Sequence, residues 1–127
     1  MIGIVLVSHS LRLAEGLSEL LAQIGSRSVP IVIAAGTADG RLGTNPDRVA
    51  EALAEADQGD GAVIIPDLGS AVLSVKVALE GADPARAVVV DAPFVEGAVA
   101  AAVIAASGGD LAAVAAAARE ARGVAKL

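Results

Sequence analysis

The sequence of 127 residues lacks cysteine, tryptophan and tyrosine, and it contains one phenylalanine and one histidine. The lack of cysteine excludes disulfides, thiolate catalysis and cysteine-ligated metal sites, and it fits a reducing compartment. With so few aromatic rings there is little on which nucleic-acid bases can stack. Lys and Arg total 9 against 15 Asp and Glu, which gives a net charge of -6. We expect no nucleic-acid partner, because binding phosphates requires a basic surface.

Long apolar runs are also missing, although 55% of the residues are hydrophobic. A membrane span needs roughly 18 apolar residues without a charge, and charges, glycine or proline interrupt every run before that length. The chain begins with a strand-like run rather than a basic and apolar leader. We therefore expect a cytoplasmic protein that does not insert into a membrane. Its length predicts one compact domain covering residues 1–127.

Four short runs rich in Val and Ile predict β-strands. They are continuous rather than alternating, which is typical of strands buried on both faces of a parallel sheet. The runs are Ile2–Val7, Val29–Ala35, Gly61–Pro66 and Arg86–Ala92.

Segments with helical periodicity lie between and after these runs. The first has a predicted apolar face of Leu13, Leu17, Leu20, Leu21 and Ile24, with Gly25 as its C-terminal cap. The second begins at Pro46 after the N-cap Asn45 and turns Val49 and Leu53 inward. A third is expected to be capped by Ser70 and stopped by Gly81, and two alanine-rich helices are expected at Phe94–Ala106 and Asp110–Ala121. This alternation predicts an α/β layer sandwich with right-handed crossovers.

Functional groups in such a sheet collect on the loops that follow the carboxyl ends of the strands. Here those loops are Ser8–Ser10, Gly36–Pro46, Asp67–Ser70 and Ala92–Gly97. Because the loops open on the same edge of the sheet, we expect the four ionisable residues His9, Asp39, Asp67 and Glu96 to be neighbours.

His9 lies one residue before a helix that Ser10 can cap, beside unpaired backbone N–H groups and the positive end of a helix dipole. A second helix N-terminus follows Asp67 and Gly69. Helix N-termini favour phosphate, so His9 is well placed to carry a phosphoryl group on a ring nitrogen. Asp67 is then expected to accept a hydrogen bond from the other ring nitrogen. Backbone N–H groups of Ser8, Ser10, Gly69 and Ser70 are expected to stabilise the phosphate.

Other interpretations of these residues stay open from spacing alone. His9 is equally compatible with an inert loop histidine, and an isolated aspartate such as Asp67 more often caps a turn. The stretch GTADGRLGT lacks the lysine of a P-loop and the spacing of a dinucleotide fingerprint, so its glycines are interpreted as turn residues. No G-x-S-x-G elbow occurs, and one histidine without cysteine makes a metal site unexpected. Asp91 and Glu96 could form a carboxylate pair, but the sequence does not fix their separation.

The combined motifs resemble a known family. The chain carries VSHS, LAEGL, AAGTADGRLGTNP, DLGSAVLSVKVALE and APFVEGAVAAAVIAASGGDL in this order, from Ile2 to about Val114. Together they resemble the phosphoryl-carrier subunit of phosphoenolpyruvate-dependent dihydroxyacetone kinase, whose first domain belongs to the mannose-type enzyme IIA group of the bacterial phosphotransferase system (PTS). The resemblance implies a single-domain three-layer sandwich with a four-stranded parallel sheet, commonly as a homodimer.

The resemblance also implies a function. His9 would accept a phosphoryl group from phospho-HPr as a tele-phosphohistidine, oriented by Asp67, and pass it to ADP held by the kinase's nucleotide-binding subunit. The regenerated ATP would phosphorylate dihydroxyacetone on the substrate-binding subunit, and this chain itself would bind no cofactor. An apolar rim for protein partners is expected around His9, made of Leu11, Leu42, Leu68 and Phe94.

Two departures from the family pattern accompany this resemblance. Some members of the family continue into an HPr-like domain and part of an enzyme I domain, whereas this sequence stops at Leu127, so a separate HPr is expected to be the donor. Pro66 stands just before Asp67, where an apolar or small residue is more usual, and it could alter how the aspartate is presented. Two other functions stay open: the IIA component of a mannose-type sugar transporter, and a non-catalytic α/β dimerisation module.

Overall fold

The computed structural model describes residues 1–24, 27–37 and 39–127, so the predicted cap at Gly25 lies outside the described residues. The strands are β1 (Gly3–Ser8), β2 (Ile31–Ala35), β3 (Ala62–Pro66) and β4 (Ala87–Val89). The helices are α1 (Leu11–Ile24), α2 (Pro46–Ala56), α3 (Gly69–Leu79), α4 (Phe94–Ala106) and α5 (Leu111–Glu120), followed by a 3₁₀ turn at Ala121–Gly123. The strands form one parallel sheet in the order β2-β1-β3-β4.

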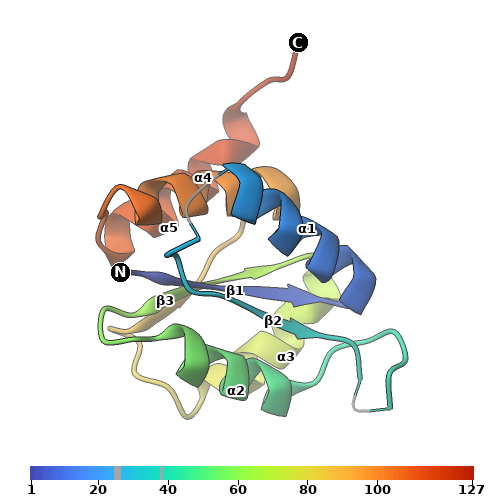
Figure 1. The fold of residues 1–127 in the computed structure, drawn as a ribbon. Helices are drawn as coiled ribbons and strands as arrows, with labels where there is room; N and C mark the ends of the chain where they lie inside the picture. The colour runs from blue at the N-terminus through green and yellow to red at the C-terminus, as the bar shows by residue number, and fades with distance from the viewer. Residues whose placement is uncertain (25–26, 38) are drawn as a thin grey trace.

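The sheet lies between two layers of helices, with α1, α4 and α5 on one face and α2 and α3 on the other (Figure 1). Each layer buries its own apolar cluster against the sheet. Ile4 and Leu6 of β1 belong to the first cluster, whereas Val5 and Val7 belong to the second. This alternation follows from the two-residue period of a strand. The predicted single-domain three-layer α/β sandwich is confirmed. In the described part of the chain, no helix is long and apolar enough to cross a bilayer.

The first helix uses a narrower apolar face than its sequence predicts. Leu17 and Leu21 are buried together with the small Ala14, but Leu13, Leu20 and Ile24 are exposed. The prediction that all five large residues of this face are buried is therefore wrong. The physical reason is that Ala14 lets the helix approach the sheet along a line turned away from Leu13.

Among the other helices, α2 and α5 have side-chain N-caps, whereas α3 and α4 do not. Asn45 accepts a hydrogen bond from the Asp47 N–H at 2.9 Å, as expected of the α2 N-cap. At α5, Asp110 is the N-cap rather than the first helical residue, and it accepts from the Ala113 N–H at 2.9 Å. The predicted Ser70 cap is wrong, because α3 begins at Gly69 after an extended Leu68. The helix ends at Leu79, two residues before Gly81.

Pro66 ends β3 and explains why β4 is short. The Asp67 N–H donates to Val7 O at 2.9 Å, so the nitrogen of the preceding residue faces the opposite neighbour, β4. There the Val90 N–H donates to Ile64 O at 2.9 Å, and the next rung would need an N–H at position 66. Proline has none, so the β3–β4 ladder stops at this point. The hydrogen bond that positions Asp67 beside β1 is not affected.

Candidate active site

The site lies where two neighbouring strands end and the chain leaves them in opposite directions. In the parallel register Val7 pairs with Pro66, so His9 and Asp67 directly follow adjacent strand ends. From β1 the chain continues to β2 on one side of the sheet, and β3 lies on the other side. Such a switch point opens a crevice between diverging loops, which is where α/β sheets bind their ligands. The topology therefore brings together two residues that are 58 positions apart.

Asp67 contacts both the backbone and the ring of His9. Its Oδ1 lies 2.9 Å from His9 Nδ1, and its Oδ2 accepts the His9 backbone N–H at 3.0 Å. Oδ1 also accepts the Leu68 N–H at 2.7 Å. The Asp67 side chain is 7% exposed and the His9 side chain 27% exposed. The carboxylate is thus fixed within the fold, whereas the imidazole reaches the surface.

The pKa of the Asp67 carboxyl lies below its ordinary value of 3.8. Burial raises this pKa, but hydrogen bonds from the His9 N–H, the His9 ring, the Ser8 hydroxyl and the Leu68 N–H outweigh the burial. The aspartate is therefore ionised near neutral pH and can only accept hydrogen bonds.

An ionised Asp67 determines the tautomer of His9. Because the carboxylate can only accept, His9 Nδ1 carries the hydrogen and Nε2 of the neutral ring carries the lone pair. The Ser70 hydroxyl lies 2.8 Å from Nε2 and can donate to it. Ser70 is the second residue of α3, which places the ring beside the N-terminus of that helix. The arrangement therefore presents a nucleophilic nitrogen next to backbone N–H groups that favour an anion.

The two serines that flank His9 have different surroundings. Ser10 caps α1, because its hydroxyl accepts the Leu13 N–H at 3.3 Å. Ser8 is completely buried, donates to Asp67 Oδ2 at 2.9 Å and accepts the Ser10 N–H at 3.1 Å. The prediction that the Ser8 N–H stabilises the phosphate is therefore wrong, because no part of this residue reaches the surface. Gly69 and Ser70 are exposed at the start of α3.

The glycine-rich loop after β2 supports the site through its backbone. Gly43 donates its N–H to His9 O at 2.9 Å, and Gly36 donates to Ser8 O at 3.2 Å. Both have positive φ, at 138° and 72°, and Gly40 has a φ of 83°. Such values suit glycine, so these residues serve as turn residues, as their spacing predicts. No motif in the sequence indicates that this loop contacts the backbone of His9.

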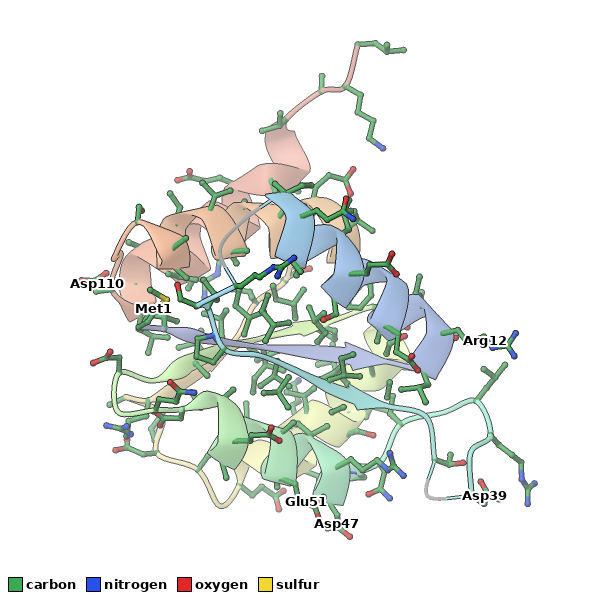
Figure 2. The ribbon with its side chains drawn as sticks, in the orientation of Figure 1. Met1, Arg12, Asp39, Asp47, Glu51 and Asp110 are labelled. Atoms are coloured by element: carbon green, nitrogen blue, oxygen red, sulfur yellow. The ribbon has the colours of Figure 1, made fainter. Side chains whose placement is uncertain are left out.

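The other two predicted neighbours of His9 are engaged elsewhere. Asp39 accepts from the Thr37 hydroxyl and from Arg41 Nε, the latter at 2.7 Å. Figure 2 shows Asp39 at the tip of the β2–α2 loop, pointing to solvent. Glu96 pairs with Lys126 at 3.2 Å. The prediction that the four ionisable residues gather at one edge is therefore confirmed only for His9 and Asp67.

The remaining carboxylate and metal possibilities find no support in these contacts. Asp91 pairs with Arg122 at 2.8 Å, so Asp91 and Glu96 each face a separate cation rather than each other. Within residues 1–24, 27–37 and 39–127, no three His, Asp or Glu side chains gather closely enough to hold a metal ion.

Three of the four residues of the predicted apolar rim are at the surface. Leu11, Leu42 and Leu68 are 49%, 77% and 61% exposed, although each side chain is fully apolar. Phe94 instead packs against the cluster beneath α1, α4 and α5. Phe94 is only half-buried there, so its place in the rim stays a prediction.

Comparison with known proteins identifies the family. The family model EIIA-man, described as PTS system fructose IIA component, matches residues 3–115. A curated relative from Listeria innocua, named phosphoryl donor subunit DhaM of PEP-dependent dihydroxyacetone kinase 2, is 44% identical over 106 residues, covering 81% of this chain and 85% of that protein. The DhaM subunit of Escherichia coli is 44% identical over 117 residues, covering 87% of this chain but 25% of that longer protein.

A solved structure agrees with this assignment. The crystal structure of EF1359, titled a protein of unknown function, is 38% identical and has a TM-score of 0.84, covering 94% of this chain and 95% of that one. The shared sequence, the shared fold and the His9–Asp67 pair at the strand ends point the same way. The chain belongs to the EIIA-man family of phosphotransferase-system IIA components.

Proposed function

We propose that this chain is a histidine phosphocarrier, the phosphotransferase component of a phosphoenolpyruvate-dependent dihydroxyacetone kinase in the cytoplasm. His9 accepts a phosphoryl group from phospho-HPr and transfers it to ADP on the nucleotide-binding subunit. The resulting ATP phosphorylates dihydroxyacetone on the substrate-binding subunit. The observation that carries the proposal is the hydrogen bond between His9 Nδ1 and Asp67, which leaves the Nε2 lone pair at the surface. The names of the relatives supply the kinase context.

The proposed reaction has two transfers at one nitrogen. In the first, the lone pair of His9 Nε2 forms a bond to phosphorus while the donor's phosphorus–nitrogen bond breaks and its electron pair returns to HPr. In the second, an oxygen of the ADP β-phosphate attacks the same phosphorus, and the bond to Nε2 breaks. Both transfers have a loose transition state that needs alignment and charge stabilisation more than covalent chemistry.

The residues around Nε2 have proposed parts in these transfers. Asp67 stabilises the ring while it carries the phosphoryl group, because its carboxylate keeps the hydrogen bond to Nδ1. The Ser70 hydroxyl turns from Nε2 to a phosphoryl oxygen. The N-terminus of α3 at the exposed Gly69 supplies further positive potential. No cofactor bound by this chain is needed, since the partner subunit holds ADP and ATP.

The proposed donor and acceptor are both proteins, so the site must be reachable by a large surface. His9 is accessible, and Leu11, Leu42 and Leu68 expose apolar side chains. Exposed apolar residues near a site are typical of a protein docking surface. A homodimer is also part of the proposal, and sedimentation equilibrium of the purified chain would test it.

The experiment that tests the proposal is phosphorylation in vitro. The chain is incubated with enzyme I, HPr and phosphoenolpyruvate, and its intact mass is expected to rise by about 80 Da. His9→Ala is expected to gain no mass. Phosphorylation of this variant would overturn the assignment of His9, and an unmodified wild-type chain would favour a non-catalytic dimerisation module.

A second stage identifies the acceptor. The phosphorylated chain is mixed with ADP, dihydroxyacetone and the two other kinase subunits, and formation of dihydroxyacetone phosphate is measured. Rapid dephosphorylation of His9 with product formation supports the kinase role. Stable phosphohistidine that is discharged only by the membrane components of a mannose-type transporter would favour the sugar-transport alternative.

A further inference from the structure

Ser8 is a polar side chain with no exposed surface, at the carboxyl end of β1. Its hydroxyl accepts the Ser10 N–H at 3.1 Å and donates to Asp67 Oδ2 at 2.9 Å. Because the ionised carboxylate of Asp67 can only accept, the hydroxyl hydrogen is directed to it. A buried hydroxyl with both functions used in this way has a fixed orientation.

The four donors around Asp67 divide evenly between its two oxygens. Oδ1 faces His9 Nδ1 and the Leu68 N–H, and Oδ2 faces the Ser8 hydroxyl and the His9 N–H. Three of these donors belong to His9 and Leu68, in the loops after β1 and β3. Ser8 alone donates from within a strand, where its own carbonyl is held by the Gly36 N–H at 3.2 Å. It is therefore the donor most rigidly attached to the sheet.

The tautomer of His9 depends on what the groups bonded to its two ring nitrogens can donate or accept. The Ser70 hydroxyl at Nε2 can donate or accept, so it tolerates either tautomer. The Asp67 carboxylate accepts only, so it selects the tautomer with hydrogen on Nδ1, provided that Oδ1 stays in line with that atom. Rotation of the carboxylate would weaken this selection, and a fraction of the molecules would then carry the hydrogen on Nε2.

We propose that Ser8 is a positioning residue that acts through Asp67. Its buried hydroxyl holds Oδ2 so that Oδ1 faces His9 Nδ1, and this keeps the lone pair on Nε2. The catalytic consequence rests on the proposed phosphotransfer at His9, whereas the effect on the tautomer does not.

The test uses the fact that His9 is the single histidine of the chain, so its ring gives unambiguous ¹⁵N NMR signals. Spectra are recorded at about pH 9, where imidazoles are neutral. Wild type is expected to show hydrogen on Nδ1 and a bare Nε2. In Ser8→Ala the two ring signals are expected to move towards each other, and phosphoryl transfer from HPr is expected to slow about tenfold. Ser8→Thr keeps a hydroxyl and is expected to restore both.

The matched control is Ser74→Ala, which removes a hydroxyl that is only partly buried. Ser74 Oγ bonds Thr44 Oγ1 at 2.6 Å and is not one of the four donors around Asp67. This variant is expected to lose stability while keeping the wild-type ring signals. If Ser8→Ala does not fold, Ser8→Cys takes its place, because a thiol has nearly the same shape and is a weaker donor.

Wild-type ring signals in folded Ser8→Ala or Ser8→Cys would overturn the proposal, as would a folded Ser8→Thr whose signals remain displaced. The two hypotheses fail separately. An unphosphorylated wild-type chain would contradict the proposed function, and the ring spectra would still decide the role of Ser8.

Discussion

The two edges of the sheet each hold an aspartate whose carboxyl pKa is lowered, and the two sites differ in what the aspartate holds. At the carboxyl edge Asp67 binds the His9 ring. At the amino edge Asp57 accepts the N–H groups of Gly59 and Gly61 at 3.0 and 2.9 Å and binds Arg86 through Nε and Nη2 at 2.9 and 2.8 Å. The Gly59 N–H contributes most to lowering the pKa of Asp57, followed by Arg86.

The difference shows that a lowered carboxyl pKa does not by itself indicate a reactive site. Arg86 is permanently charged and offers no lone pair, so the Asp57 cluster can only hold the C-terminal end of α2 to the residues that precede β3 and β4. His9 keeps a second nitrogen free for chemistry after Asp67 has occupied the first. The partner of the carboxylate, rather than the carboxylate, separates the structural site from the candidate functional one.

The largest effect is expected from Asp67→Ala. Without the carboxylate the tautomer of His9 is no longer selected, and the rate of phosphoryl transfer from HPr should fall about a hundredfold or more. Stopped reactions analysed by intact mass give this rate. Circular dichroism establishes that the variant is folded. Transfer at the wild-type rate would show that the orienting role is misassigned.

A smaller effect on transfer is expected from Leu68→Ser, beside Asp67. Loss of this exposed apolar side chain should raise the HPr concentration needed for half-maximal transfer by about three- to tenfold, because docking surface is lost. Val77 of α3 is 53% exposed near the opposite edge of the sheet, so Val77→Ser is the matched control and should change nothing. Equal effects of the two variants would argue against a docking surface around His9.

Asp57→Ala should leave the transfer rate within about twofold of wild type while lowering stability. The two glycine N–H groups lose their acceptor, which should reduce the free energy of unfolding by about 1–2 kcal/mol. Urea unfolding followed by circular dichroism measures this difference. A large loss of transfer in a folded Asp57→Ala protein would break the distinction between the two edges.

The smallest effect is the dependence of stability on pH that both aspartates share. Each carboxyl has a lower pKa in the folded chain than its ordinary value of 3.8, so the unfolded chain binds more protons as the solution becomes acidic. The stability from this source is complete above pH 3.8 and is lost as the pH falls through the folded values. Urea midpoints between about pH 6 and about pH 2.5 should decline less steeply for the double variant Asp57→Ala/Asp67→Ala than for wild type.

The strands and the His9–Asp67 contact could be predicted because they depend on strong local signals. Buried parallel strands read as continuous Val and Ile runs, and loops at the ends of adjacent strands must meet. The start of α3 could not be predicted from Ser70, because Leu68 is already extended and its N–H is taken by the carboxylate of Asp67. The contact between Leu68 and Asp67, rather than the capping preference of Ser70, therefore determines where α3 begins.

The role of Ser8 was beyond sequence reasoning for a different reason. Serine is usually exposed, and its type gives no indication that this particular hydroxyl is enclosed between strands and bonded to an aspartate 59 positions away. For the exposed leucines of α1, too, the residue type did not reveal the degree of burial. Periodicity identifies which residues share a helix face, but the packing angle decides how many of them reach the core.

Pro66 also has a consequence on the other side of β3, between β3 and β4. Because position 66 carries no N–H, neither β4 nor an incoming peptide can extend the hydrogen-bonded ladder along this side of β3. A hollow of 390 Å³ remains where the chain leaves β3 and β4, lined by Asp67, Leu68, Val89 and Ala92 among others. Packing can be altered by many substitutions, but a missing amide hydrogen is a covalent property of the residue. Because Pro66 has no N–H, no added strand can pair with β3 at this position and close the hollow beside Asp67.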